Sequence, residues 1–209
     1  MTDADTYTEL IHLLNRQGWA VIDTVVPAPW QAGLLAQARQ WWAAGQFTVG
    51  EIGRSDTGAH QPTIRGDSIC WVRPDADIAA HPFFAWMRQF RRVLNEDYGM
   101  GLRSQEFHFA RYDAGAGYKK HIDQHRGTDH RKVSIVLYLN PDWDARDGGE
   151  LCLYDPYRPE VEIQRFAPVG GRLAVFVSGV MPHQVMPAQA TRWSLTGWLR
   201  TDPIPGVPE

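Results

Sequence analysis

Hydrophobic residues in the first hundred positions recur three or four residues apart, which is the spacing of an α-helix with one buried face. Leu10, Ile11 and Leu14 form such a stripe. Pro29 and Pro82 each stand where a helix is expected to begin, because proline suits a first helical turn. The pattern predicts three helices, with one short strand after the first of them; in chain order these four elements cover residues 6–17, 19–22, 29–45 and 82–99.

Beyond residue 104 the pattern changes to short apolar runs separated by glycine and proline. Many short strands at this spacing are typical of a β-sandwich or barrel, and a jelly roll would place ligands from separate strands at its open mouth. We therefore predict an α+β fold that is mainly β, with N-terminal helices supporting a jelly-roll core. A strand, 68–72, precedes the third helix, and the later strands are predicted at residues 105–112, 133–140, 150–155, 161–166, 172–177, 184–186 and 192–200.

Residues 47–63 contain several glycines among polar residues and show little regular apolar spacing. An ordered loop of this length is often a lid or a binding loop, and the alternative is a plain surface loop. The chain has no internal repeat or linker, so we expect one domain over 1–209. Its helical support and lid loop would occupy 1–103 and its β-roll catalytic core 104–201.

Composition places the chain among ordinary soluble domains, with 44% hydrophobic and 22% charged residues. A net charge of −3 gives no basic footprint for nucleic acid. Cys70 and Cys152 each lie in an apolar run, which favours buried free thiols over a disulfide. The acidic start of the sequence lacks the layout of a signal peptide, and no apolar run reaches the length of a membrane span. We therefore expect a cytoplasmic protein.

His121 and Asp123 carry the first chemical signal. In an extended strand their side chains would project to the same face. His183 is the best third partner, and Arg192 opens the last predicted strand. Two histidines and one carboxylate on one side of a metal, with the other side open, are the ligand set of non-haem Fe(II) oxygenases. The alternative is a group of ordinary polar residues at strand ends, and His108 is predicted to be an ordinary strand residue.

Further motifs run through most of the sequence. They are Ile64-Arg65-Gly66-Asp67 with Ile69 and Trp71, Arg111-Tyr112, Gly117–Asp123, Leu137–Asn140, Asp142–Asp144, Gly148–Leu151, Pro182–Val185, Ala190–Arg192 and Trp198. Together they resemble the Fe(II)- and 2-oxoglutarate-dependent prolyl hydroxylases, especially the oxygen-sensing, hypoxia-inducible-factor type and its bacterial relatives, over about three-quarters of the chain. The resemblance implies a double-stranded β-helix, with Fe(II), 2-oxoglutarate and O2 as reactants and ascorbate in a supporting role.

The resemblance also assigns roles at the site. It implies that His121, Asp123 and His183 hold the iron, and that Arg192 binds the distal carboxylate of 2-oxoglutarate through two parallel hydrogen bonds. Arg192 should point into the barrel, where it would be a costly unpaired charge without that carboxylate.

Four neighbours are predicted to contact the cosubstrate. Tyr138 is similar to a family tyrosine that bonds the same carboxylate, and Tyr112 would lie near the metal end. For both, a core tyrosine with a satisfied hydroxyl is the alternative. Thr196 and Trp198 share the face of Arg192 by the period of two along a strand.

The implied reaction is hydroxylation of a prolyl residue in a protein, coupled to conversion of 2-oxoglutarate into succinate and CO2. Arg65, Asp67, Tyr118 and Arg131 resemble elements that enclose a peptide, so we predict that they contact the substrate. Two alternatives stay open. One is the same chemistry on a small molecule such as a free amino acid, and the other is a jelly-roll binding module without turnover. The retained Asp123 carboxylate argues against halogenation.

Overall fold

The computed structural model describes residues 3–23, 25–51, 63–124 and 127–203. Its helices are α1 (Asp3–Gln17), α2 (Ala28–Ala43) and α3 (Pro82–Tyr98), with short 3-10 turns η1 (Asp77–Ala80) and η2 (Ala145–Asp147). The strands are β1 (Trp19–Ile22), β2 (Thr48–Val49), β3 (Asp67–Trp71), β4 (Ser104–Tyr112), β5 (Tyr118–His121), β6 (Arg131–Tyr138), β7 (Leu151–Tyr154), β8 (Glu162–Phe166), β9 (Leu173–Val177), β10 (His183–Val185) and β11 (Arg192–Arg200).

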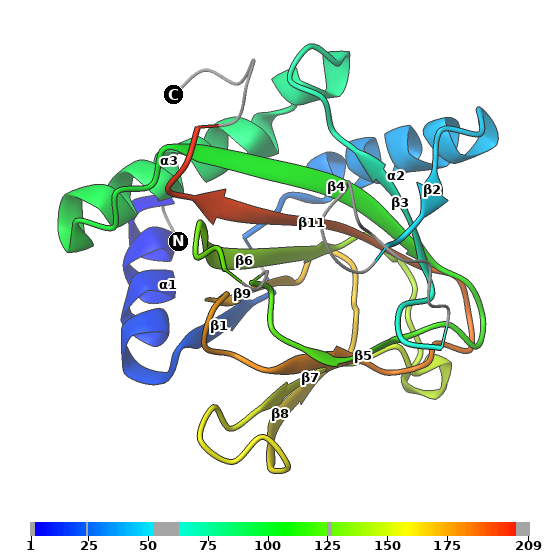
Figure 1. Cartoon of the computed structure of the whole chain (residues 1–209). Helices are drawn as coiled ribbons and strands as arrows, with labels where there is room; N and C mark the ends of the chain where they lie inside the picture. Colours follow the sequence, from blue (N-terminus) through cyan, green and yellow to red (C-terminus); the bar gives the residue numbers. More distant parts are fainter. Residues whose placement is uncertain (1–2, 24, 52–62, 125–126, 204–209) are drawn as a thin grey trace.

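The strands form two antiparallel sheets that lie one over the other (Figure 1). The larger sheet has the order β1-β9-β6-β11-β4-β3-β2, and the smaller has the order β5-β10-β7-β8. Figure 1 shows the three helices on the side of the larger sheet that faces away from the smaller one. The prediction of a mainly β, double-stranded β-helix with supporting helices is confirmed.

The helices form where the apolar spacing predicted them. α3 begins at Pro82, where the Nδ1 atom of His81 accepts a hydrogen bond from the backbone N–H of Phe83, and it ends at Gly99 with φ +58°. Glycine enters this left-handed conformation without the steric cost that other residues incur. Because both ends are defined locally, the predicted bounds of this helix agree with the structure.

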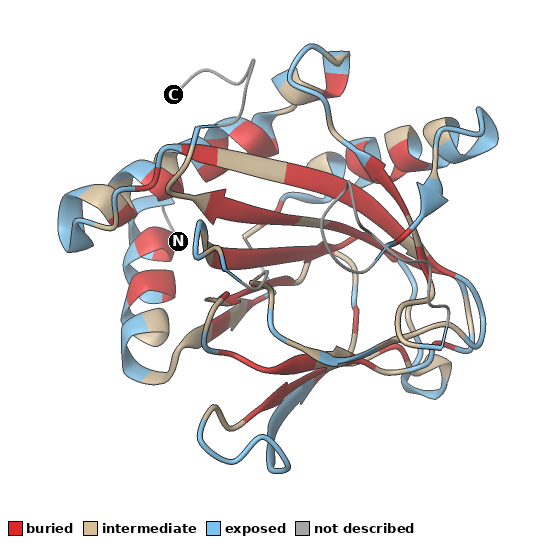
Figure 2. Ribbon diagram, in the orientation of Figure 1, coloured by how far each residue is buried: buried red, intermediate tan, exposed pale blue. Residues whose placement is uncertain are grey.

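Alternation along β6 divides its side chains between two apolar layers. Ile135 and Leu137 pack toward the helices, whereas Val136 and Tyr138 pack between the sheets. Because both faces are covered, the strand reads as a nearly continuous apolar run. Figure 2 shows the buried residues along β4, β6 and β11, while β8 is mostly exposed. The candidate site occupies the space between the two sheets.

Residues 47–63 begin with a short strand instead of the expected irregular loop. β2 pairs with β3, and Phe47 packs edge-on against Trp193 with ring centroids 5.9 Å apart. Residues 52–62, the main part of the predicted lid, lie outside the described residues, so the lid stays a prediction. Cys70 and Cys152 are buried free thiols, as expected. Within the described ranges, no helix is long and apolar enough to cross a membrane.

Candidate active site

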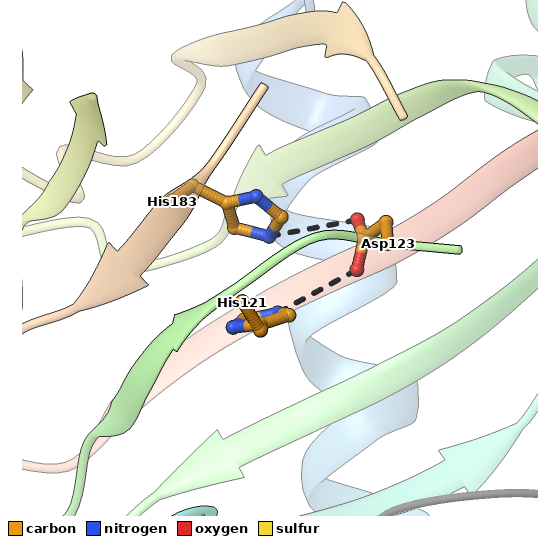
Figure 3. A group of neighbouring side chains, drawn as sticks. All are labelled: His121, Asp123 and His183. Carbon is orange, nitrogen blue, oxygen red and sulfur yellow. Dashed lines mark ion pairs between the residues drawn. The ribbon is translucent and has the colours of Figure 1, made fainter. Parts of the chain in front are cut away.

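Three side chains with metal-binding atoms meet at one end of the smaller sheet (Figure 3). His121 is the last residue of β5, and His183 is the first residue of β10 and pairs with it across the two strands. Asp123 lies just beyond the end of β5 instead of within an extended strand. Its Oδ1 is 3.6 Å from Nε2 of His121 and its Oδ2 is 3.6 Å from Nε2 of His183. The ligand atoms of the three residues all lie within 4.8 Å of one another.

Backbone carbonyls hold both imidazoles in the orientation that a metal needs. Nδ1 of His121 lies 2.7 Å from the carbonyl oxygen of Lys119, and Nδ1 of His183 lies 3.0 Å from that of Met181. A carbonyl oxygen only accepts hydrogen bonds, so each Nδ1 carries the proton. The lone pair of each neutral ring is therefore on Nε2, toward Asp123, which is the arrangement seen around metal-ligating histidines.

The charge states also fit a divalent cation. Burial lowers the pKa of His183 to about 4, helped by His121, so the imidazole is neutral at physiological pH. Burial alone would raise the pKa of Asp123, but in acid the charge of protonated His183, together with the interaction with His121, outweighs burial and holds that pKa well below its usual range, so the carboxylate is ionised. Two neutral nitrogens and one anionic oxygen on one side of an open centre fit Fe(II).

Arg192 is completely enclosed in the space between the sheets, with 1% of its surface exposed. Its Nε donates a hydrogen bond to the carbonyl of Gly149 at 2.9 Å, and its guanidinium carbon lies 5.0 Å from the ring centroids of both Tyr112 and Tyr138. No carboxylate within the described ranges forms an ion pair with it. A buried cation without a counter-charge is costly, so this position fits an anionic ligand.

The hydroxyl of Tyr138 also indicates a ligand beside Arg192. This hydroxyl is buried and makes no hydrogen bond within the part of the chain that the structure describes. The alternative interpretation, in which Tyr138 is a core tyrosine with a hydrogen-bonded hydroxyl, therefore does not fit the described structure. The carboxylate of 2-oxoglutarate would supply an acceptor for both Arg192 and Tyr138. Tyr112, which pairs with Arg192 across β4 and β11, lies beside the guanidinium.

The remaining predicted cosubstrate residues lie on the same face of β11 as Arg192. Thr196 and Trp198 alternate with apolar residues that point to the helices, and Trp198 is almost fully buried. The guanidinium of Arg131 lies over the indole of Trp198, 3.5 Å from the ring centroid, and its Nε donates to Glu106 at 2.9 Å. Arg131 is thus fixed by an aromatic ring and a carboxylate at the edge of the site.

Arg65, Asp67 and Tyr118 form a connected group near His121, Asp123 and His183. The guanidinium of Arg65 donates two hydrogen bonds to the carboxylate of Asp67, at 2.6 and 3.0 Å, and lies 5.1 Å from the ring centroid of Tyr118. Tyr118 stacks on His121 with ring centroids 3.6 Å apart. The charges of Arg65 and Asp67 are matched to each other. Contact with a substrate stays a prediction for these three residues.

Ser134 is a functional neighbour that the sequence reasoning missed. Its hydroxyl donates a hydrogen bond to Oδ2 of Asp123 at 2.8 Å, and the hydroxyl of Ser178 lies 2.8 Å from it. A signal for Ser134 was present. Counting back by twos from Tyr138 places this serine on the inner face of an otherwise apolar strand.

The comparisons with known proteins agree with this geometry. A family profile described as the 2OG-Fe(II) oxygenase superfamily matches residues 107–200. A crystal structure of a prolyl-4-hydroxylase from Pseudomonas putida is 37% identical, covers 93% of this chain and 99% of its own, and superposes with a TM-score of 0.83. A prolyl hydroxylase from Trichoplax adhaerens, solved with a hypoxia inducible factor peptide fragment, is 27% identical, with 95% and 90% coverage and a TM-score of 0.80.

Among curated proteins, Egl nine homolog 1 of Rattus norvegicus is 27% identical over 195 residues, which are 90% of this chain and 57% of the relative. The chain thus spans about half the length of that relative and of its mouse and human counterparts. The fold and the site together are those of the 2OG-Fe(II) oxygenase superfamily. The chain belongs to the prolyl hydroxylases of the 2OG-Fe(II) oxygenase superfamily. The predicted resemblance and the predicted use of Fe(II), 2-oxoglutarate and O2 are confirmed.

Proposed function

We propose that this chain hydroxylates a prolyl residue in a protein or peptide, with oxidation of 2-oxoglutarate to succinate and CO2. The observation that supports it most is the buried Arg192 and Tyr138 pair, which has no anionic partner among the described residues and lies in the same inter-sheet space as the His121–Asp123–His183 group. The superposed prolyl hydroxylase structures from Pseudomonas putida and Trichoplax adhaerens, at 37% and 27% identity, add support.

Two groups of residues would bind the iron and the 2-oxoglutarate. Nε2 of His121, Nε2 of His183 and the carboxylate of Asp123 would hold Fe(II) from one side, leaving the other side to reactants. When bound, the iron supplies the oxidation of 2-oxoglutarate by O2 and the transfer of an oxygen atom to a substrate C–H bond. Arg192 and Tyr138 would hold the distal carboxylate of 2-oxoglutarate, which fixes the direction of the molecule in the site.

A peptide substrate is favoured over a free amino acid by the surroundings of the metal ligands. The Trichoplax relative was solved with a peptide fragment, and this chain superposes on it along nearly its whole length. In this chain Tyr118 stacks on His121, and the Arg65–Asp67 pair lies beside Tyr118. Arg131 lies over the ring of Trp198. Such an extended rim would contact the residues on both sides of a target proline.

The test is to incubate the protein with Fe(II), 2-oxoglutarate, air and a pooled library of short peptides, each with one central proline. We expect a mass gain of one oxygen atom on proline in a subset of peptides, in proportion to the succinate released. The Asp123→Ala variant should give neither product. Succinate release with no hydroxylated peptide, but with hydroxylation of free proline, would contradict a peptide substrate and favour a small-molecule substrate.

Two further expectations rest on the sequence alone. We propose that the protein is cytoplasmic and that ascorbate sustains its activity by keeping the iron reduced. Cell fractionation tests the first, and the number of turnovers with and without ascorbate tests the second.

A further inference from the structure

Three aromatic side chains from separate strands meet on the inner face of the larger sheet. His108 on β4 pairs with Trp71 on β3 and with Thr196 on β11. The His108 ring centroid is 4.9 Å from that of Trp71 and 5.4 Å from that of Trp198. Trp71 is 43% exposed, whereas His108 and Trp198 are buried. The three rings therefore lead from the surface at β3 into the space between the sheets.

Two nitrogens of this ring cluster are buried and have no hydrogen-bond partner among the residues that the structure describes. They are Nδ1 of His108 and Nε1 of Trp198, and in the described part of the chain only Tyr138 Oη and Gln105 Oε1 share this condition. Leaving a buried polar atom unpaired is costly, and proteins seldom keep two on adjacent rings without a use. Tyr138 Oη is already accounted for by the cosubstrate carboxylate. The unpaired nitrogens of His108 and Trp198 indicate a second ligand group.

His108 meets that group as a neutral ring. Burial, with added repulsion from Arg65 and Arg131, lowers the pKa of His108 to about 3, although Asp67 and Asp123 act in the opposite direction. A neutral imidazole has one donor and one acceptor nitrogen, and the indole N–H of Trp198 is a donor only. The ring cluster is thus equipped for hydrogen bonding and for packing, without a charge.

The ring cluster adjoins the metal ligands through one pair of residues. Trp198 pairs across the strands with Ser134, whose hydroxyl holds the carboxylate of Asp123. Arg131 lies over the Trp198 ring and keeps it in place. A group bound at the cluster would therefore lie next to the iron position, on the side that leads to the exposed Trp71.

We propose that His108 is a positioning residue for the substrate, and that it acts with Trp198 to bond the carbonyl groups that flank the target prolyl residue. This inference rests on the proposed function and deepens it. The peptide bond before proline has no N–H, so its only hydrogen-bonding group is a carbonyl acceptor. Buried donors match that group, and flat aromatic rings pack against the apolar pyrrolidine ring. If another residue replaced the target proline, its backbone N–H would face the N–H of Trp198, and two donors cannot bond each other.

The test compares His108→Phe, which keeps the ring and removes both nitrogens, with His108→Asn, whose amide can replace the Nδ1 contact. The probe is a peptide that the wild-type protein hydroxylates. Loss of one buried hydrogen bond should raise the KM for this peptide about 5- to 100-fold in His108→Phe. His108→Asn should recover most of the loss. The KM for 2-oxoglutarate and the slow release of succinate without peptide should stay at the wild-type level in both variants.

A peptide with a thioamide before or after the proline sharpens the result, because sulfur is a weaker acceptor than oxygen. At one of the two positions the thioamide should raise the KM of the wild-type protein and leave that of His108→Phe unchanged. An unchanged peptide KM in His108→Phe would overturn the inference and leave the proposed function intact. Equal loss of peptide-free succinate release would also overturn it, since that result indicates a purely structural role. A wild-type protein that hydroxylates no peptide overturns both.

Discussion

The hydroxyl of Ser134 donates a hydrogen bond to Oδ2 of Asp123 across 2.8 Å and thereby connects the larger sheet to a proposed iron ligand that follows β5 of the smaller one. Asp123 lies just past the end of β5, where no ladder of backbone hydrogen bonds fixes it. Ser134 is completely buried in β6 and is supported by the hydroxyl of Ser178. The position of the carboxylate is therefore set by the next strand along the chain, which belongs to the other sheet.

Replacing Ser134 with alanine should weaken Fe(II) binding about 10- to 100-fold, which is the usual effect of removing a hydrogen bond behind a metal ligand. Titration of the metal-free protein with Fe(II) under anaerobic conditions measures this affinity. Ser104→Ala is a matched control, because Ser104 is also buried but bonds the backbone of Asp202. Equal affinities of Ser134→Ala and Ser104→Ala would contradict a role for Ser134 in holding Asp123.

Replacing Arg192 with lysine should weaken 2-oxoglutarate binding by about 1–3 kcal/mol, because an ammonium group cannot form two parallel hydrogen bonds to a carboxylate. The KM for 2-oxoglutarate should rise accordingly, while the Fe(II) affinity stays near the wild-type value. Arg172→Lys serves as the control, since Arg172 pairs with Asp23 at the surface. A KM unchanged by Arg192→Lys would show that another group holds the cosubstrate.

Tyr138→Phe should separate stability from binding. The Tyr138 hydroxyl has no hydrogen-bond partner among the described residues, so its removal should leave the free energy of unfolding of the ligand-free protein unchanged or slightly higher. Without that hydroxyl the KM for 2-oxoglutarate should rise. Chemical denaturation and steady-state kinetics measure the two quantities. A clear loss of stability in the ligand-free protein would mean that the hydroxyl serves the core.

Two buried histidines should make the metal-free protein less stable in acid. Burial lowers the pKa of His108 to about 3 and that of His183 to about 4, from an ordinary value of 6.5. The unfolded chain therefore binds more protons than the folded protein, and the free energy of unfolding falls as pH drops from 6.5 toward about 4. Each histidine contributes about 1.4 kcal/mol per pH unit. His108→Phe should remove one such contribution, and an unchanged pH slope would contradict the assigned burial effect.

The parts of the site that could be predicted are those encoded by local spacing. Alternation along β11 places Arg192, Thr196 and Trp198 on one face. Alternation also puts Ser134 on an inner face, but its contact with Asp123 and the role of His108 could not be predicted, because both depend on which strands become neighbours. β6 lies between β9 and β11, and His108 acquires its aromatic neighbours from β3 and β11. Sheet order is a property of the whole chain, so a single sequence does not display it.

The same difference between local sequence signals and long-range strand pairing explains which parts of the fold could be predicted. The ends of α3 follow from Pro82 and Gly99, which act locally, and so they were predicted. β2 was missed because two residues carry no recognisable alternation, and Thr48 and Val49 become a strand only by pairing with β3. Asp123 was expected inside a strand, yet its side chain still meets His121, since Ser134 holds it there.

The most direct measurement of the central claim is Fe(II)-dependent release of succinate from 2-oxoglutarate by the wild-type protein and by His183→Ala. The wild-type protein should release succinate only when Fe(II) is present. His183→Ala should release none, while the variant unfolds in denaturant as cooperatively as the wild type does. Succinate release by His183→Ala at the wild-type rate, or release by the wild type without Fe(II), would contradict the assignment of His121, Asp123 and His183 as the iron ligands.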